Sequence, residues 1–372
     1  MATRTSIDTR PYSDKERLLR SETDSPTSDG FDNPTPPARS NPLTTIALLA
    51  TLTLTLLLSI LTTTHITHKS THPFSIPSAP PPEICDHATA RPAFHTLPLH
   101  RRHAYVRAVQ RLTTLPSRLG LNTSLYDDFT YVHIQLTWKV HHVAISLPFH
   151  RYFVAVFEKV LKDEGGYDGV MPYWDWTVDA ADPLSSAVFN SSSGFGRDGR
   201  AKDGCVDGLL GGKVANYSEA GYDPHCVTRV FDDDGDDGML HNKAWSGDVV
   251  RNIMESSQTY DEFRERLENG PHRHLHWGIG GEMPSASSTN DPLFFLHHAQ
   301  IDRLWWLWQQ RNPEKRNAEF FGPIWVENEM LAESGAGILD GIKMLGLTQD
   351  VSVQQVMRTD TELLCYKYKM EL

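Results

Sequence analysis

The chain has 372 residues, enough for one large domain with appendages or for two average domains. Apolar residues make up 39% and charged residues 22%, which is globular usage and excludes a chain that is disordered throughout. The net charge of −12 argues against a nucleic-acid-binding domain, which should carry a basic face. Four cysteines are too few for a disulfide scaffold, so a hydrophobic core must carry the fold, and 18 histidines favour metal chemistry.

The first part of the chain differs sharply in composition from the rest. Residues 1–42 are rich in Ser, Thr, Pro and charge without an apolar period, which predicts a disordered tail. Residues 43–63 (LTTIALLATLTLTLLLSILTT) lie in a stretch without charge between Arg39 and Lys69, and that length suffices for a membrane-spanning helix. A signal peptide is the alternative, but about 40 polar residues come first, whereas signal peptides begin near the N-terminus. The sequence therefore predicts an uncleaved transmembrane anchor.

The charges flanking residues 43–63 predict an orientation. The tail carries six basic residues and the other flank offers only Lys69 nearby, so we expect a single-pass membrane protein with a cytoplasmic N-terminus and a lumenal or extracellular domain. Residues 64–83 are proline-rich and predict an extended stalk. Three N-x-S/T sequons, at Asn122, Asn190 and Asn216, would suit glycosylation of the domain that follows.

Residues 84–372 read as one globular domain, in which the periodic segments are helical. Apolar residues recur at helical spacing after His150 and again from Ile301 to Trp308, so we expect His150 and His298 each to open a helix, and convincing alternating strands are few. The predicted fold class is therefore mainly α, with long loops. The cysteines offer two closures, although neither pairing follows from sequence alone. Cys205 and Cys226 bracket a Gly-rich loop, and Cys85 and Cys365 could tie the two ends of the domain.

Histidines in this domain form two triplets: His133, His141 and His150, then His272, His276 and His298. A single imidazole on an apolar helix face is more often a packed core residue than a ligand. Two matching triplets favour metal binding, and the i, i+4 spacing of His272 and His276 lets both rings meet one ion. Three neutral imidazoles without Cys, Met or carboxylate indicate copper or zinc with open coordination positions.

The segments around both triplets carry a family resemblance. The first triplet lies in YDDFTYVH and HHVAISLPFHRYF, and the second in GPHRHLH and NDPLFFLHHAQIDRLWWLWQ. These segments resemble the two copper-binding regions of the tyrosinase (polyphenol oxidase) family in its fungal form. The resemblance implies a helical bundle around two copper ions, a binuclear type 3 centre, with one ion on each triplet. It also implies an oxidoreductase that oxidises o-diphenols to o-quinones with O2 and, in true tyrosinases, first hydroxylates monophenols.

Several neighbouring residues invite roles under this resemblance. Glu268 stands where similar proteins keep a carboxylate that holds a water near the coppers; a helix-end charge is the alternative. Arg273 stands where many tyrosinases have Asn, so we expect it to affect substrate binding or selectivity. His297 adjoins a ligand, but the family pattern assigns the ligand to His298. Asp302 could orient a ligand ring or pair with an arginine.

Three functions follow as hypotheses. The first is a copper-dependent phenol oxidase that uses O2 and a phenolic small molecule or a tyrosyl peptide, in secondary-metabolite or pigment biosynthesis. The second is an oxygen-binding protein of the hemocyanin kind, and the third is a redox-inactive copper or zinc protein. The intact histidine triplets favour an active metal centre, and no nucleic-acid partner is expected.

Overall fold

The computed structural model describes residues 83–199, 204–233, 238–241, 243–326, 329–331 and 335–371. The described helices are α2 (Leu99–Leu112), α3 (Leu125–Val140), α4 (Ser146–Asp163), α5 (Trp176–Asp179), α6 (Gly247–Ser256), α7 (Tyr260–Leu267), α8 (Arg273–Ile279), α9 (Leu293–Gln310), α10 (Pro313–Arg316) and α11 (Val353–Val356). The described strands are β1 (Thr89–Ala90), β2 (Val214–Ser218), β3 (Gly221–Cys226), β4 (Ile324–Val326), β5 (Glu329–Leu331), β6 (Gly341–Ile342), β7 (Val351–Ser352) and β8 (Tyr366–Lys367). The prediction of a mainly α fold is confirmed for these residues.

The prediction of a membrane-spanning protein is wrong. Within the part of the chain that the structure describes, every helix is too short or too polar to cross a bilayer. The longest described helices, α4 and α9, have 18 residues each, but both carry charged and imidazole side chains that are buried inside the domain. The single-pass arrangement with a cytoplasmic N-terminus and a lumenal or extracellular domain is therefore withdrawn. The predicted tail (1–42), anchor (43–63) and, except for its last residue, stalk (64–83) lie outside the described residues.

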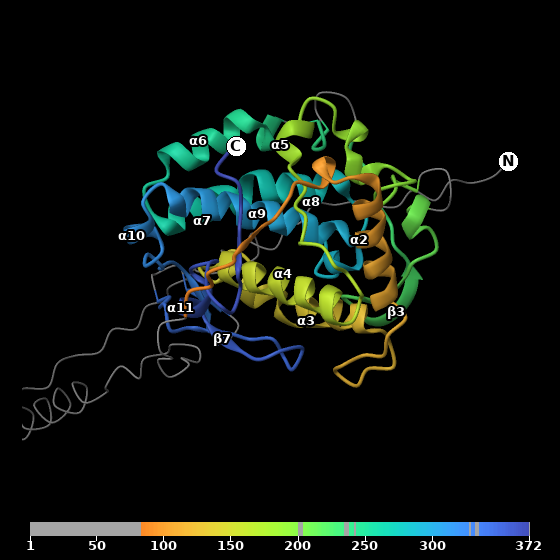
Figure 1. Cartoon of the computed structure of the whole chain (residues 1–372), viewed down its shortest axis with the longest axis horizontal. Helices are drawn as coiled ribbons and strands as arrows, with labels where there is room; N and C mark the ends of the chain where they lie inside the picture. Colours follow the sequence, from red (N-terminus) through yellow and green to blue (C-terminus); the bar gives the residue numbers. More distant parts are fainter. Residues whose placement is uncertain are drawn as a thin grey trace, which may run out of the picture. The chain divides into compact units, whose positions relative to one another are not determined.

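The long helices pack around one another, and α4 and α9 lie at the centre (Figure 1). Helix α4 packs along α9, and α3 lies beside α4. Helix α7 contacts α9 through the stacked rings of Phe263 and Trp308, whose centroids are 4.9 Å apart. Helix α2 contacts both α3 and α4. Helices α3, α4 and α9, which meet in this arrangement, carry one histidine of the two triplets each: His133, His150 and His298.

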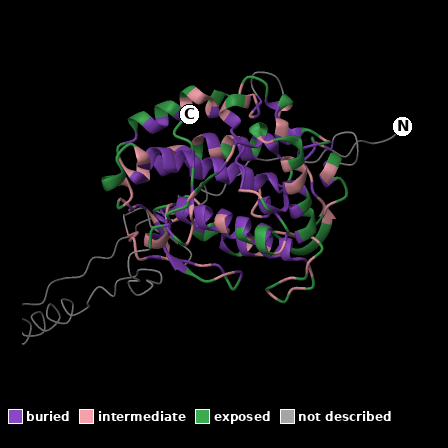
Figure 2. Ribbon diagram, viewed as in Figure 1, coloured by how far each residue is buried: buried purple, intermediate pink, exposed green. Residues whose placement is uncertain are grey.

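Burial follows the apolar period of the sequence. Figure 2 shows α9 and much of α4 as buried, whereas α6 and α2 alternate between buried and exposed faces. Phe157 of α4 stacks on Phe295 of α9 with 3.5 Å between ring centroids, and Phe129 of α3 meets both rings edge-on. These aromatic contacts join the three helices that carry His133, His150 and His298.

The helix starts are fixed by local chemistry. Ser124 caps α3 in a reciprocal capping box with Asp127, which satisfies two otherwise unpaired N–H groups. Helices α4 and α9 begin one turn or more before the histidines that were expected to open them, at Ser146 and Leu293. Pro148 lies in the first turn of α4, and Pro292 directly precedes α9, positions where a missing N–H costs no helical hydrogen bond.

The described strands form four two-stranded pairs, and two disulfides lie beside them. Strands β1 and β8 pair in parallel, next to a disulfide that joins Cys85 to Cys365. Strands β2 and β3 form an antiparallel hairpin whose end is joined to the preceding loop by the Cys205–Cys226 disulfide. Of the sequon asparagines, Asn122 and Asn190 are exposed, whereas Asn216 is half-buried and donates to Asp127.

Asp302 lies in a buried network of charges, and among the described residues its carboxylate bonds to arginines and tyrosines rather than to a histidine ring. Its carboxylate accepts from Arg151 at 2.5 Å and from Arg91 at 3.3 Å. The hydroxyls of Tyr366 and Tyr368 donate to it at 2.6 and 2.7 Å. Of the two roles predicted for Asp302, the structure therefore contains the pairing with arginine. This network joins α4, α9 and β8.

Replacing Asp302 with alanine should destabilise the domain strongly. The substitution leaves two buried guanidinium groups, those of Arg91 and Arg151, without one of their carboxylates, and breaking a buried ion pair costs about 3–5 kcal/mol. The measurement is the free energy of unfolding of the variant in denaturant. The same change at Asp168, whose pair with Arg101 is exposed, should cost no more than about 1 kcal/mol. Equal effects at the two positions would contradict the assignment.

Candidate metal centre

The first histidine cluster is built by α3, the turn after it and α4. His133 projects from α3, His141 is the C-cap residue of α3, and His150 lies in the second turn of α4. One nitrogen from each of these three rings lies within 4.8 Å of the others. The chain reverses between the helices at His142, which adopts a φ of 61°. This tight turn brings His141 back toward His150, with 4.9 Å between ring centroids.

Each ring in the first cluster is oriented through its Nδ1 atom. His133 Nδ1 donates to the carbonyl of Ala286, at 2.7 Å, His141 Nδ1 to Thr137, and His150 Nδ1 to Ser146, both at 2.8 Å. The proton is therefore assigned to Nδ1, which leaves the Nε2 lone pair free. The Nε2 atoms of His133 and His150 are buried without a hydrogen-bond partner among the described residues. Buried polar atoms are normally satisfied, so these two unpaired nitrogens are placed to bind a metal ion.

The second cluster is built by a helix junction and α9. Residues Glu268–His272 form a π-helical turn between α7 and α8. Pro271 lacks an N–H and Gly270 has non-helical dihedrals (φ −92°, ψ −112°), which explains why the α-helix is interrupted here. Despite the junction, the rings of His272 and His276 lie 4.5 Å apart, as their i, i+4 spacing predicts.

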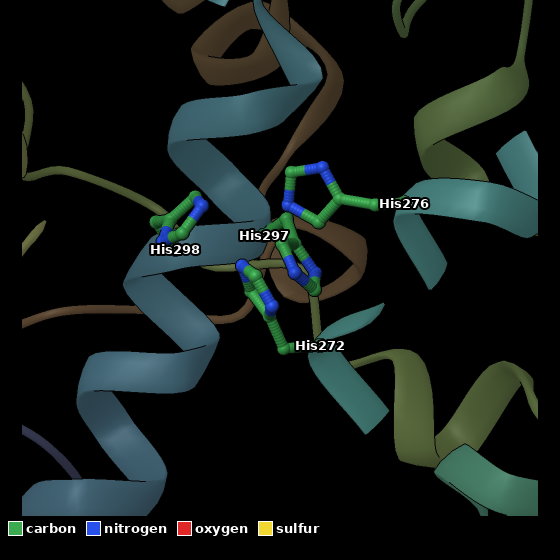
Figure 3. Close-up of side chains that lie close together, drawn as sticks. All are labelled: His272, His276, His297 and His298. Carbon is green, nitrogen blue, oxygen red and sulfur yellow. The ribbon is translucent and has the colours of Figure 1, made fainter. Parts of the chain in front are cut away.

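Four imidazoles meet in the second cluster, as Figure 3 shows. His297 and His298 project from α9, His276 from α8, and His272 from the turn between α7 and α8. His276 Nδ1 donates to the carbonyl of Met283, at 2.6 Å, and His272 Nδ1 contacts the carbonyl of Glu268 at 3.3 Å. Both ring nitrogens of His297 and of His298 are buried without a partner among the described residues. The family pattern had set His297 aside, yet its ring lies 4.8 Å from that of His276. The signal in the sequence that could have revealed this contact is that His297 directly precedes His298.

The two clusters adjoin each other. His150 of the first cluster stacks on His298 of the second with 4.1 Å between ring centroids, and His141 lies 6.3 Å from His272. Phe294 packs against His133, His150 and His298, at 5.0, 6.0 and 4.1 Å, and closes one side. The arrangement can hold two metal ions next to each other, each facing the same space.

Burial keeps these imidazoles neutral. It lowers the pKa of His133 to about 3 and that of His276 to about 4. Burial, and then the neighbouring histidines, hold the pKa values of His150, His272 and His298 well below the ordinary value. A metal ligand must be a neutral imidazole, so binding an ion here requires little proton release at neutral pH. No carboxylate or thiolate joins the donors of either cluster among the described residues, a set that suits copper or zinc.

A pocket of about 540 Å³ opens onto both clusters. His133 and His141 of the first cluster and His272 and His276 of the second line it. Two tryptophans on its wall, Trp138 and Trp277, are 72% and 50% exposed. The pocket is large enough to admit a single aromatic ring with substituents to both metal positions.

Glu268 and Arg273 also line this pocket, but they do not pair with each other. Glu268 is buried and forms an ion pair with Arg264, at 2.8 Å. Its other oxygen accepts from the backbone N–H of His142 and from Ser146 Oγ, at 2.8 and 3.0 Å. Arg273 is exposed, with its guanidinium 6.0 Å from the centre of the Trp277 ring. The i, i+4 spacing of Arg264 and Glu268 could have revealed their pairing in the sequence.

The helical fold and the paired imidazole clusters define a protein of the type 3 copper class. The common central domain of tyrosinase matches residues 123–311, and the chain belongs to the tyrosinase family. It is 35% identical over 293 residues to tyrosinase ustQ of Aspergillus flavus, covering 76% of this chain and 80% of that protein. It is 36% identical over 313 residues to the tyrosinase-like protein phomQ1' of Diaporthe leptostromiformis, covering 78% and 82%.

A solved structure supports the same assignment. A variant of the polyphenol oxidase of Thermothelomyces thermophila is similar to this chain with a TM-score of 0.66 and 26% identity, over 77% of this chain and 91% of that one. The family implies a binuclear type 3 copper centre. The orphaned, neutral imidazoles of the two clusters fit such a pair, because each cluster offers at least three donors and none of them is charged.

Proposed function

We propose that this protein is a copper-dependent oxidase that converts o-diphenols to o-quinones with O2. The observation that carries the proposal is that one pocket reaches histidines of both clusters. We assign one copper to His133, His141 and His150, and the other to His272, His276 and His298. When bound, the copper pair supplies the two-electron exchange between O2 and the phenol that neither ion could perform alone. The phenolic compound is a small molecule or a tyrosyl side chain of a peptide, and the product serves secondary-metabolite or pigment biosynthesis.

The residues of the chain prepare this chemistry in three ways. The carbonyl acceptors on the Nδ1 atoms keep the rings in the tautomer that presents Nε2 to the metal. The pocket wall, with Trp138 and Trp277, offers aromatic surface against which a phenol ring can stack. Burial removes water from the rings and keeps each imidazole neutral, so that its Nε2 atom stays unprotonated.

Glu268 is placed to hold one water at most. A carboxylate has about four lone-pair sites, and three of them accept from Arg264, His142 and Ser146. The ion pair with Arg264 engages the oxygen that does not accept from His142 and Ser146. Arg273, which follows His272, has donors only and cannot accept a proton from a water. We therefore propose that catechol oxidation exceeds monophenol hydroxylation.

The activity is tested on the copper-loaded full chain, by oxygen uptake with a catechol. Turnover with quinone formation is the expected result. A protein that binds two copper ions but gives no turnover with any catechol would be of the oxygen-binding kind, and one that binds no copper would be of the redox-inactive kind.

Replacing Arg273 with asparagine should raise the ratio of monophenol hydroxylation to catechol oxidation. A phenol with a pKa of about 10 is almost wholly protonated at neutral pH, so hydroxylation needs an acceptor beside the pocket. Asparagine adds an amide oxygen that can accept a hydrogen bond, and arginine does not. The measurement is oxygen uptake on a catechol and on its matched monophenol for both proteins. An unchanged ratio in the variant would contradict this role for Arg273.

A further inference from the structure

One loop contacts a histidine of each cluster. We call residues 280–287, between α8 and the turn at Ser288–Asn290, the bridging loop. The Ala286 carbonyl accepts from His133 of the first cluster, and the Met283 carbonyl accepts from His276 of the second. The Nδ1 atoms of His141, His150 and His272, in contrast, meet carbonyls four residues earlier in the chain. The orientations of His133 and His276 therefore depend on the bridging loop.

Two glutamates fix the bridging loop to the β2–β3 hairpin. Glu219, in the turn between β2 and β3, accepts from the backbone N–H of Ala286 at 2.8 Å. Glu282 is buried, and its Oε1 accepts from His225 Nε2 at 3.1 Å and from Thr228 Oγ1 at 3.2 Å. Its Oε2 accepts from the side-chain amide of Asn290 at 3.1 Å. Glu282 thus holds the first half of the bridging loop, and Glu219 holds the second half.

The backbone of the loop is built for this close contact. Gly280 and Gly281 have φ values of 64° and 59°, and a Cβ atom on either would lie 2.2 Å from a carbonyl oxygen, of Val230 or Thr228. These two carbonyls belong to residues 228–230, which follow β3. Thr228 pairs with Cys205, and the Cys205–Cys226 disulfide fixes Cys205 to the end of the hairpin. The loop can therefore approach this segment only with glycine at both positions.

We propose that Glu219 and Glu282 are positioning residues for the copper centre, which hold the bridging loop so that one imidazole in each cluster is correctly oriented. The inference rests on the proposed ligand set. Hydrogen bonds to the second nitrogen of a metal-bound imidazole typically change metal affinity by about 10–100-fold. Because a single loop serves both clusters, loosening it weakens both copper sites together.

Substitutions by glutamine and by alanine distinguish the hydrogen bonds of each carboxylate from its charge. Glu219→Gln keeps an oxygen that can accept from the Ala286 N–H, so it should behave like the wild type, whereas Glu219→Ala should bind both ions about 10-fold more weakly. Glu282→Gln must turn an NH2 group either toward the side-chain NH2 group of Asn290 or toward the backbone N–H of Thr228, both of which donate to the carboxylate. This substitution should therefore weaken copper binding as Glu282→Ala does.

The experiment uses the full chain loaded with copper and dialysed against increasing concentrations of a copper chelator, with copper per chain as the readout. The expected result is that Glu219→Ala and both Glu282 variants lose the two ions together, at about 10-fold less chelator than the wild type. Glu164→Ala, which removes a carboxylate paired with Arg118 elsewhere on the surface, is the matched control.

Three results would overturn the proposal: retention of one ion at wild-type affinity in Glu219→Ala, equal weakening by Glu219→Gln and Glu219→Ala, or wild-type retention in both Glu282 variants. Circular dichroism of the copper-free proteins reports whether each variant folds. If the alanine variants fail to fold, the contrast between Glu219→Gln and Glu282→Gln decides. A wild-type chain that binds no copper pair would instead refute the proposed function.

Discussion

Replacing His276 with alanine should lower the copper content from two ions to one per chain and abolish phenol oxidation. His276 lies in the second cluster with a buried, unpaired Nε2, and its ring is held by the Met283 carbonyl. Removing the ring deletes one of three ligands and leaves the carbonyl without its donor. Because the proposed reaction needs both ions, the loss of one should remove all activity. Metal analysis of the purified variant and oxygen uptake on a catechol measure the two effects.

His274 provides the matched control for this substitution. It lies two residues away on the same helix, but its Nδ1 bonds to the carbonyl of Gly270 and its ring is not among the clustered imidazoles. His274→Ala should therefore keep two copper ions and most of the activity. Oxidase activity that survives in His276→Ala, or copper lost equally from both variants, would contradict the proposed ligand set.

His297 makes the second cluster a set of four, so the identity of its third ligand needs its own comparison. Both His297 and His298 are buried with unpaired nitrogens, but only His298 stacks on His150 of the other cluster. The family pattern and this contact both favour His298 as the ligand. The copper contents of His297→Ala and His298→Ala show which histidine is the ligand, because only the loss of the ligand should remove a copper ion.

The regular features of the site could be predicted from sequence because they depend on helical geometry. The apolar period placed α4 and α9 in the core, and the spacing of His272 and His276 predicted that their rings would meet. The helix starts were predicted too late because Pro148 and Pro292 were not considered as residues that favour a first turn. Spacing also implied a pair that was overlooked, Arg264 with Glu268.

Other features had no readable signature. The carbonyls of Met283 and Ala286 orient two histidines, but backbone acceptors are present at every residue, so only the fold reveals which are used. The partners of Asp302 come from elements more than 60 residues away. The inference of an anchor depended on the lack of charge in residues 43–63, although seven of these residues are threonines, which contribute little apolar surface.

Lowering the pH from about 7 to about 5 should strongly destabilise the copper-free protein. The pKa of His133 is about 3 and that of His276 about 4 in the folded state, against an ordinary value of 6.5. Below about pH 6.5 the unfolded chain therefore takes up protons that the folded chain excludes, so acid favours unfolding. Each of these two histidines should cost about 2 kcal/mol over this range, and His150, His272 and His298 act in the same direction.

The measurement is the free energy of unfolding of the copper-free protein in denaturant, as a function of pH. Its slope gives the number of protons taken up on unfolding. His133→Gln should reduce this number by about one in the acid range, because a residue that titrates only when unfolded has been removed. The same substitution at the exposed His87 controls for the loss of a histidine as such. A copper-free protein equally stable at both pH values would show that these imidazoles are hydrated and charged in the fold, contrary to their burial.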